Sequence, residues 1–236
     1  MTFDLLSVLE YWPTFARGLL VTLWVSVAAA ICGLLLASLL VLCQIMGRGF
    51  GRALTGTWLI VMRGAPFIAL VYSIHMLLPL TGWRPAPIAS GLIALSAFCS
   101  AYYAEVIRAA IQSLPAGQWE SARVMGMSRM QAARHVIIPQ LWKPALPSLI
   151  GNTMTMIKES SVLSVLTVAE LTYQGLVIQG KTFAPFEVFI ITATLYWLLT
   201  LGLILVARAA EKRWLSPGAE EIKLSPIGHK FLSLRR

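Results

Sequence analysis

Long uncharged runs dominate the pattern of polar and apolar positions along the chain. Asp, Glu, Lys and Arg are all absent from residues 18–47, 64–83, 85–104 and 188–207. Each run is about as long as a helix that crosses a hydrocarbon core roughly 30 Å thick. The pattern therefore predicts an all-α integral membrane protein with about five transmembrane helices.

Breaks in the apolar pattern set the expected spans. Ala65 precedes Pro66 inside the second apolar run, so a helix that begins near Thr57 should break or kink there. The fourth region contains Lys158 and Glu159, so it is either a re-entrant segment or a span whose charges face protein, and we favour the span. The expected spans are Gly18–Leu42, the broken segment from Thr57, Pro87–Ala110, Leu146–Val168 and Phe186–Ala207, with residues 171–187 as a mixed connector.

Small side chains mark the first span. Ala29, Gly33 and Ala37 recur every four residues, a spacing that allows helix backbones to approach closely in lipid. The three cysteines show no pairing pattern, and we expect them to be small buried hydrophobes rather than disulfide or metal ligands. They are Cys32, Cys43 and Cys99.

Composition supports a membrane protein. Only 12% of residues are charged, against about 25% in soluble domains, and the mean hydropathy is +0.76. The first residues carry acidic groups where a secretory signal has basic ones, so we expect the first span to be retained. The net charge of +9 would suit a nucleic-acid partner, but its distribution indicates membrane topology instead.

Basic residues gather on one face of the five-span arrangement. The opposite face holds only Arg17, Arg84 and Lys181. The positive-inside rule then predicts a periplasmic segment 1–17, a transmembrane domain 18–209 and a cytoplasmic tail 210–236. The residues assigned to the cytoplasm are Arg48, Arg52, Arg108, Arg123, Arg129, Arg134, Lys143, Arg208, Lys212, Arg213, Lys223, Lys230, Arg235 and Arg236.

A polar insert at about 112–142 follows the third span and lies in the predicted cytoplasm. Pro115 suits the first turn of a helix, and Gly126 suits the left-handed residue that ends it. A Ser-x-x-Gln capping box at Ser128 begins a second helix, which should stop before Pro139. The insert is either an amphipathic hairpin on anionic lipid or a docking element for a cytoplasmic partner.

The residues of the insert resemble the EAA loop of ABC-transporter permeases, which reads Glu-Ala-Ala, three residues, Gly, nine residues, Ile-x-Leu-Pro. Here Glu120-Ser121-Ala122, Gly126 and Val136-Ile137-Ile138-Pro139 keep that spacing, with conservative changes at Ser121, Val136 and Ile138. The stretches "AYYAEVIRAAIQSLPAGQWESARVMGMS", "IIPQLWKPALPSLIGNTMTMIKESSVLSV" and "RGAPF" look like permeases for polar amino acids of the histidine/glutamine/arginine type. The resemblance covers about residues 15–215.

The resemblance implies a type-I (MetI-like) importer permease in the bacterial inner membrane. Such a chain works with a second permease, identical or homologous, two ABC ATPase subunits inside, and a periplasmic or lipid-anchored solute-binding protein outside. The chain has no G-x-x-x-x-G-K-[ST] loop, so we expect ATP and Mg to bind the partner ATPase and no cofactor to bind here. The implied coupling residues are Glu120, Ser121, Ala122, Arg123, Gly126, Ser128 and Pro139.

Ionisable groups near spans are functional hypotheses by default. Glu105 could bind a substrate ammonium, but an ion pair with Arg108 on the same helical face is favoured. Arg63-Gly64-Ala65-Pro66 resembles the family's Arg-Gly-Thr-Pro, although Ala65 lacks the hydroxyl. Lys158 to Ser160 resembles its Lys-Asp-Thr-Ser, which implies structural or gating roles. The candidates for the substrate path or its gate are Arg63, Glu105, Asn152, Lys158, Glu159 and Ser160.

Two other classes of protein fit less well. A stand-alone secondary carrier is disfavoured by the odd number of spans and by the lack of an internal repeat. A membrane-embedded enzyme should show convergent catalytic groups, and the sequence shows none. His75 stands alone on an apolar segment, so we expect no metal site.

Overall fold

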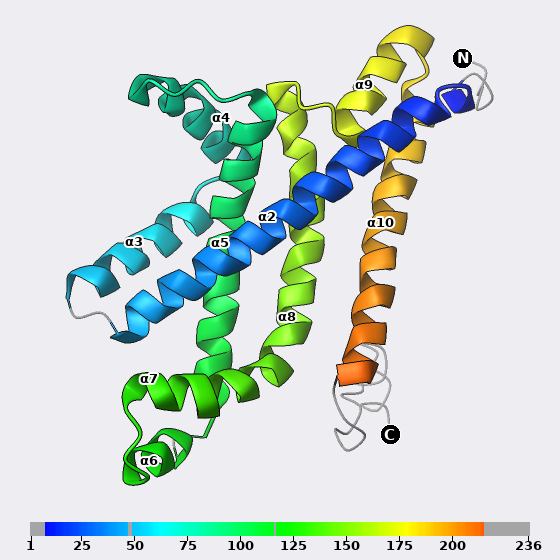
Figure 1. The fold of residues 1–236 in the computed structure, drawn as a ribbon. Helices are drawn as coiled ribbons and strands as arrows, with labels where there is room; N and C mark the ends of the chain where they lie inside the picture. Colours follow the sequence, from blue (N-terminus) through cyan, green and yellow to red (C-terminus); the bar gives the residue numbers. More distant parts are fainter. Residues whose placement is uncertain (1–7, 47–48, 116, 215–236) are drawn as a thin grey trace, which may run out of the picture.

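The computed structural model describes residues 8–46, 49–115 and 117–214, and every regular element in those ranges is helical (Figure 1). The helices are α2 (Trp12–Met46), α3 (Phe50–Gly64), α4 (Phe67–Leu77), α5 (Pro87–Ser113), α6 (Gly117–Val124), α7 (Arg129–Ala132), α8 (Ile138–Glu159), α9 (Leu171–Thr182) and α10 (Pro185–Trp214), with short segments η1 (Leu78–Thr81), η2 (Ala133–Ile137) and η3 (Ser160–Leu166).

Helix α2 lies across α5 and α8 (Figure 1) and extends beyond the predicted Gly18–Leu42 at both ends. Ala29 and Ala37 are fully buried, and a Cβ atom built on Gly33 would lie 2.6 Å from Cβ of Cys99 on α5. The close approach predicted from the small residues is therefore confirmed. Cys99 is buried as expected, whereas the other two cysteines lie exposed on α2, contrary to the prediction.

The predicted break at Ala65 is confirmed and is sharper than a kink. Ala65 is extended (φ −96°, ψ 144°), as expected for a residue before proline. The helical axis bends by 116° between the helices on its two sides. Helix α3 begins at Phe50 rather than near Thr57, because no proline stands between those two residues and the helix tolerates Gly51 and Gly56. The paired segments form a V, either a broken span or a re-entrant loop.

Helices α5 and α8 pack side by side at the centre of the molecule. Helix α5 matches the third predicted span, and its buried face combines small residues with Leu95 and Phe98. Helix α8 begins at Ile138, before the predicted start at Leu146, and ends at Glu159, where the tighter η3 continues the chain to Leu166. Most buried side chains of α2, α4, α5, α8 and η3 belong to one hydrophobic core.

The prediction of a mixed connector at 171–187 is wrong for most of that segment, because residues Leu171–Thr182 form helix α9. Helix α9 packs between α2 and α10, around a second core. Helix α10 is longer than the predicted Phe186–Ala207 and runs from Pro185 to Trp214. The second core is formed by Val8, Phe15, Leu171, Ile178, Val188 and Leu195.

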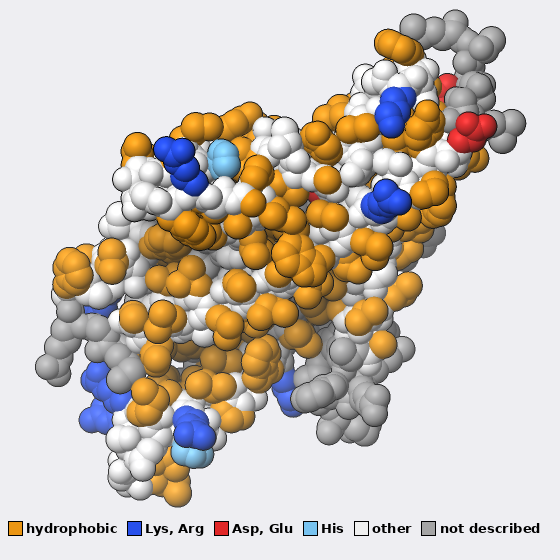
Figure 2. Space-filling view, turned by 45° about the horizontal axis from the view of Figure 1, so that its top comes forward, with side chains coloured by type: hydrophobic (Ala, Val, Ile, Leu, Met, Phe, Trp, Pro, Cys, Tyr) orange, Lys and Arg blue, Asp and Glu red, His pale blue; other side chains and the backbone are white. Residues whose placement is uncertain are grey.

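Three described helices, α2, α5 and α10, are long and apolar enough to cross a membrane, and two bent helix pairs raise the total to as many as five. In Figure 2 hydrophobic side chains cover the middle of the visible face, and Lys and Arg lie towards its two ends. Helices α6 and α7 lie at the same end as the C-terminal end of α10, and the N-terminal end of α2 lies at the other (Figure 1).

Candidate functional site

The polar insert folds as two short helices around a glycine. Helix α6 ends in a Schellman motif, in which the N–H of Gly126 donates to the carbonyl of Arg123 (2.9 Å) and the N–H of Met127 donates to that of Ala122 (3.0 Å). Gly126 has φ 76°, the left-handed region that costs an L side chain free energy. The elbow predicted from the sequence is therefore confirmed.

The predicted capping box at Ser128 is also present. Ser128 Oγ accepts from the N–H of Gln131 (3.3 Å), and Gln131 Oε1 accepts from the N–H of Ser128 (2.8 Å). These two bonds satisfy backbone donors that the first turn of α7 would otherwise leave free. The start of the second helix is thus fixed by local chemistry alone.

Pro139 does not stop the second helix, so that prediction is wrong. Residues Ala133–Ile137 adopt a π-turn, and Pro139 falls in the first turn of α8, where its missing N–H costs little. The chain is consequently helical from Arg129 to Leu166. Gln140 at the start of α8 donates to Gln118 Oε1 on α6 (3.1 Å), which fastens the first short helix to the long one.

The surface of the insert combines bare apolar side chains with cations. Val124 is 89% exposed and Met125 is 76% exposed at the tip of the elbow. Glu120, Ser121, Arg123, Gly126, Ser128 and Pro139 are exposed. Ala122 is only 3% exposed, so it packs inside the insert. Arg129 and Arg134 are exposed as well.

A second group of charges joins α3 to α5. Arg63 Nη1 lies 3.4 Å from Glu105 Oε2, and Arg108 Nε donates to the same oxygen at 3.3 Å. The predicted Glu105–Arg108 pair is confirmed, and Arg63 is an addition that the sequence did not indicate. The Arg63 guanidinium carbon also lies 5.7 Å from the ring centroid of Tyr102. The carboxylate of Glu105 thus lies between two guanidinium groups, and the three side chains together carry one positive charge in excess.

The other candidates for the path lie on α8 and at the start of η3. Asn152 and Glu159 are half-buried and Lys158 is exposed. Ser160 is buried, and its hydroxyl donates to the carbonyl of Ile157 (2.7 Å), a helix-capping contact. Within the described part of the chain, no hydrogen bond or ion pair connects these four residues to Arg63 or Glu105. The six candidates therefore form one pair and a separate series along α8.

Sequence reasoning missed Glu170, which is fully buried where α9 begins. Its carboxylate accepts from the N–H groups of Thr172 (3.0 Å) and Tyr173 (2.7 Å) and from the hydroxyl of Tyr196 on α10 (2.6 Å). The next N–H, that of Leu171, donates to Thr22 Oγ1 on α2 at 3.0 Å. Glu170 caps α9 and ties it to α10, and its place in an apolar stretch was the available signal.

The described residues contain no group of three or more His, Cys, Asp or Glu side chains that could hold a metal ion. His75 Nδ1 lies 2.9 Å from Ser90 Oγ, a hydrogen bond that joins α4 to α5. This contact gives the lone histidine a structural role.

Comparison with known proteins agrees with this arrangement. A profile of the family described as "Binding-protein-dependent transport system inner membrane component" matches residues 29–216. Over 215 residues the chain is 30% identical to the glutamine transport system permease protein GlnP of Escherichia coli strain K12, covering 90% of this chain and 98% of that one. It is 29% identical over 206 residues to the probable amino-acid ABC transporter permease protein YckA of Bacillus subtilis strain 168, covering 87% and 91%.

Solved structures share the fold. A crystal structure of an amino acid ABC transporter with histidines matches with a TM-score of 0.83 and 36% identity, covering 90% of this chain and all of that one. The MetNI methionine ABC transporter in an inward-facing conformation matches at 20% identity with a TM-score of 0.67, covering 85% and 97%, which shows the fold alone. The chain therefore belongs to the family of binding-protein-dependent transport system inner membrane components, as a multi-pass permease component of an ABC importer.

Proposed function

We propose that this chain forms the translocation path for a polar amino acid or amino-acid derivative, driven by separate ATPase subunits. Relatives described as glutamine, L-cystine and amino-acid permeases support the substrate class. The observation that carries the coupling is the exposed insert at 112–142, whose two short helices are capped at Gly126 and Ser128 and which presents exposed apolar side chains at its tip. Such a surface gains stability when a partner covers it.

Mechanical continuity supports a coupling role for the insert. Helix runs without interruption from Arg129 to Leu166, and Gln140 fastens α6 to the same rod. A displacement at the elbow therefore moves α8, which packs against α5 in the main core. Arg123, Arg129 and Arg134 would pair with acidic groups on the ATPase, while Val124 and Met125 would enter its groove.

The proposed assembly follows from the coupling role. Two ATPase subunits hold ATP and Mg on the cytoplasmic side, a second permease completes the path, and a solute-binding protein delivers substrate outside. The basic residues support an N-terminus outside and a C-terminus inside. Residues 1–17 would then be periplasmic and 210–236 cytoplasmic, on the two sides of a transmembrane domain at 18–209.

The charged pair and the polar series along α8 are the proposed substrate path or gate. The one positive charge in excess at Arg63, Glu105 and Arg108 suits a solute that carries a carboxylate. Asn152 offers an amide for hydrogen bonding, and Lys158 and Glu159 lie at the end of α8 where the helix tightens into η3. A change in the helical geometry at this junction would move the side chains of Lys158 and Glu159 together.

Reconstitution tests the proposal. The permease is placed in liposomes with its ATPase and a matched solute-binding protein, and uptake of a panel of radiolabelled amino acids is followed with and without ATP. We expect uptake only when ATPase, binding protein and ATP are all present. Transport driven by an ion gradient through this chain alone would contradict the proposal and favour the secondary carrier, and chemical conversion of the solute would favour an enzyme.

A further inference from the structure

The chain between α8 and α9 contains a 3₁₀ helix of unusual length. Segment η3 spans the seven residues Ser160–Leu166, whereas 3₁₀ runs longer than three or four residues are uncommon. It continues α8 without a break, so it forms the last part of the helical rod that begins in the insert at Arg129. A 3₁₀ stretch within a longer helix often marks a hinge or a segment under strain.

A strained residue ends this segment. Thr167 has φ 61° and ψ 21°, the left-handed region in which a β-branched residue is an outlier. Its N–H donates to the carbonyl of Ser164 (2.9 Å), and the N–H of Val168 donates to that of Leu163 (3.4 Å). Such strain persists only where the surrounding structure holds it in place. The end of η3 is therefore held by packing rather than by the local preference of Thr167.

The contact between Leu163 and Gly91 contributes to that packing. Leu163 is 1% exposed, and a Cβ atom built on Gly91 of α5 would lie 3.0 Å from its Cδ2 and 3.5 Å from its Cγ. A side chain at position 91 would therefore crowd Leu163. The missing side chain of Gly91 forms a socket for Leu163, and this contact links η3 to α5.

The residues of η3 are also suited to a second helical form. The hydroxyl of Ser160 donates to the carbonyl of Ile157, and that of Ser164 donates to the carbonyl of Ser161, both at 2.7 Å. Hydroxyls on a helix can bond to the carbonyl three or four residues earlier, so they stay paired when a 3₁₀ helix becomes an α-helix. Serine and valine supply five of the seven residues, and neither is a strong helix former, so the sequence favours neither form strongly.

The two forms differ in length and in the direction of Leu163. Seven residues rise about 14 Å as a 3₁₀ helix and about 10.5 Å as an α-helix, so conversion shortens the segment by up to about 3.5 Å. Between Glu159 and Leu163 the accumulated rotation falls by about 80°. Leu163 would then leave the socket at Gly91, so the socketed form and the short form exclude one another.

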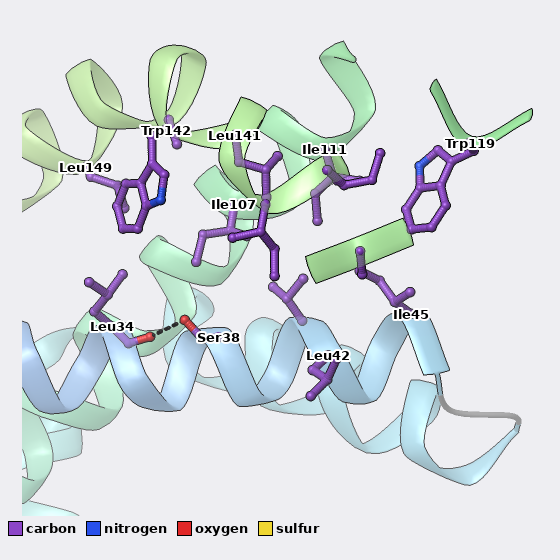
Figure 3. Close-up of a pocket in the computed structure, with 15 residues that line it drawn as sticks. Leu34, Ser38, Leu42, Ile45, Ile107, Ile111, Trp119, Leu141, Trp142 and Leu149 are labelled. Atoms are coloured by element: carbon purple, nitrogen blue, oxygen red, sulfur yellow. Dashed lines mark hydrogen bonds between the residues drawn. The ribbon is translucent and has the colours of Figure 1, made fainter. Parts of the chain in front are cut away.

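The start of α8 has room to follow such a change. An apolar groove of about 170 Å³ lies between it and α2, and Figure 3 shows Leu149 of α8 and Leu34 of α2 on its two sides. The hydroxyl of Ser38 in the α2 wall donates to the carbonyl of Leu34 (2.8 Å), and among the described residues no side-chain hydrogen bond joins α2 to α8. The hydrogen bond between Tyr103 on α5 and Thr153 on α8 (2.7 Å) is the one that would have to be remade. A displacement of α8 therefore meets little directional resistance from α2.

We propose that η3 is a switch segment of the transport cycle. The contact of Leu163 with Gly91 latches it in the long 3₁₀ form, and release of this latch converts it to a shorter α-helix. The turn from Thr167 to Glu170 takes up the rotation of the segment. A displacement of the insert then reaches α9 as a change in the length of one continuous rod. This inference rests on the proposed coupling of the insert to an ATPase.

A distance measurement in the assembled transporter tests the change in length. Spin labels are attached through Ser148→Cys on α8 and Ala169→Cys after η3, both exposed positions, with the native cysteines replaced by alanine and one labelled permease copy in each complex. Double electron–electron resonance compares the nucleotide-free complex with the complex trapped by ATP and vanadate. We expect the mean label distance to differ by about 2–3.5 Å between the two states. A control pair at Ala86 and Ala109, joined by the uninterrupted α5, should keep its distance.

A reversible cross-link tests the latch. Gly91→Cys combined with Leu163→Cys should form a disulfide on oxidation, because the two Cβ atoms lie close enough, and should then lose ATP-driven uptake until the disulfide is reduced. The control combines Gly175→Cys with Thr192→Cys, where the Cβ atoms are 4.0 Å apart and join α9 to α10 outside the switch. Oxidation of this control should leave uptake intact.

These outcomes separate the switch from the proposed function. An unchanged label distance, a failure of the pair at Gly91 and Leu163 to cross-link, or normal uptake after complete cross-linking would each overturn the switch. Absence of ATP-driven uptake by the wild type would instead contradict the proposed function itself.

Discussion

Gly33 lies where α2 crosses α5, and alanine at this position would place a Cβ atom 2.6 Å from Cβ of Cys99. Ordinary van der Waals contacts begin near 3.4 Å, so the two helices must separate locally by about 0.8 Å or more. Backbone atoms of Ser96 and Ser100 at 3.2 and 3.4 Å prevent a simple sideways escape. Overpacking of this kind costs about 1–3 kcal/mol.

Gly56→Ala on α3 is the matched control, since nothing lies within 4 Å of a Cβ atom built there. Both substitutions gain about 0.5–1 kcal/mol of helix propensity, so their difference isolates the packing cost. We expect Gly33→Ala to be less stable than Gly56→Ala by about 1–3 kcal/mol in equilibrium unfolding in mixed micelles. A second substitution, Cys99→Gly, should recover part of this loss through a favourable coupling of at least about 0.5 kcal/mol. Equal stability of the two alanine variants would refute the close α2–α5 contact.

The remaining predictions use the same unfolding assay or the reconstituted uptake assay. Glu170→Ala should destabilise the chain by more than Ser128→Ala, because it leaves the half-buried N–H groups of Thr172 and Tyr173 without an acceptor at about 1–3 kcal/mol each and breaks the tie to Tyr196, whereas an exposed N-cap contributes about 1 kcal/mol. Equal losses would contradict the Glu170 network. Glu105→Gln should reduce stability and uptake more than Arg63→Gln, because it leaves two guanidinium groups without a carboxylate while Arg63→Gln preserves the pair with Arg108. The reverse order would show that Arg63 acts separately from Glu105.

Features set by local chemistry could be predicted from the sequence. The elbow at Gly126 and the capping box at Ser128 need only residues a few positions apart, and both are present. The break before Pro66 follows from a clash between neighbouring residues, and it occurs at Ala65. Residues 85–104 carry no charge, and the helix that covers them matches the predicted span.

Features set by long-range packing were missed. Pro139 was expected to end a helix, but a preceding π-turn and the core contacts of α8 keep the chain helical beyond it. The segment 171–182 is too polar to read as a span, and its helix is capped by Glu170, which also accepts a hydrogen bond from the distant Tyr196 on α10. Arg63 meets Glu105 because α3 packs against α5, a contact between segments that lie far apart in the sequence.

The exposed elbow at Gly126 provides the most direct test of coupling. Gly126→Asp adds a charge where an ATPase groove should close, while Gly126→Asn adds similar bulk without charge, and both residues tolerate positive φ. Gly49→Asp is the control outside the insert, since Gly49 also has positive φ (59°) and no atom within 4 Å of an added Cβ.

ATP-driven uptake by these variants is measured in proteoliposomes after equal membrane insertion has been verified. We predict that Gly126→Asp inserts normally but loses uptake, that Gly126→Asn loses less, and that Gly49→Asp transports like the wild type. Normal ATP-driven uptake by Gly126→Asp would contradict the coupling role of the insert.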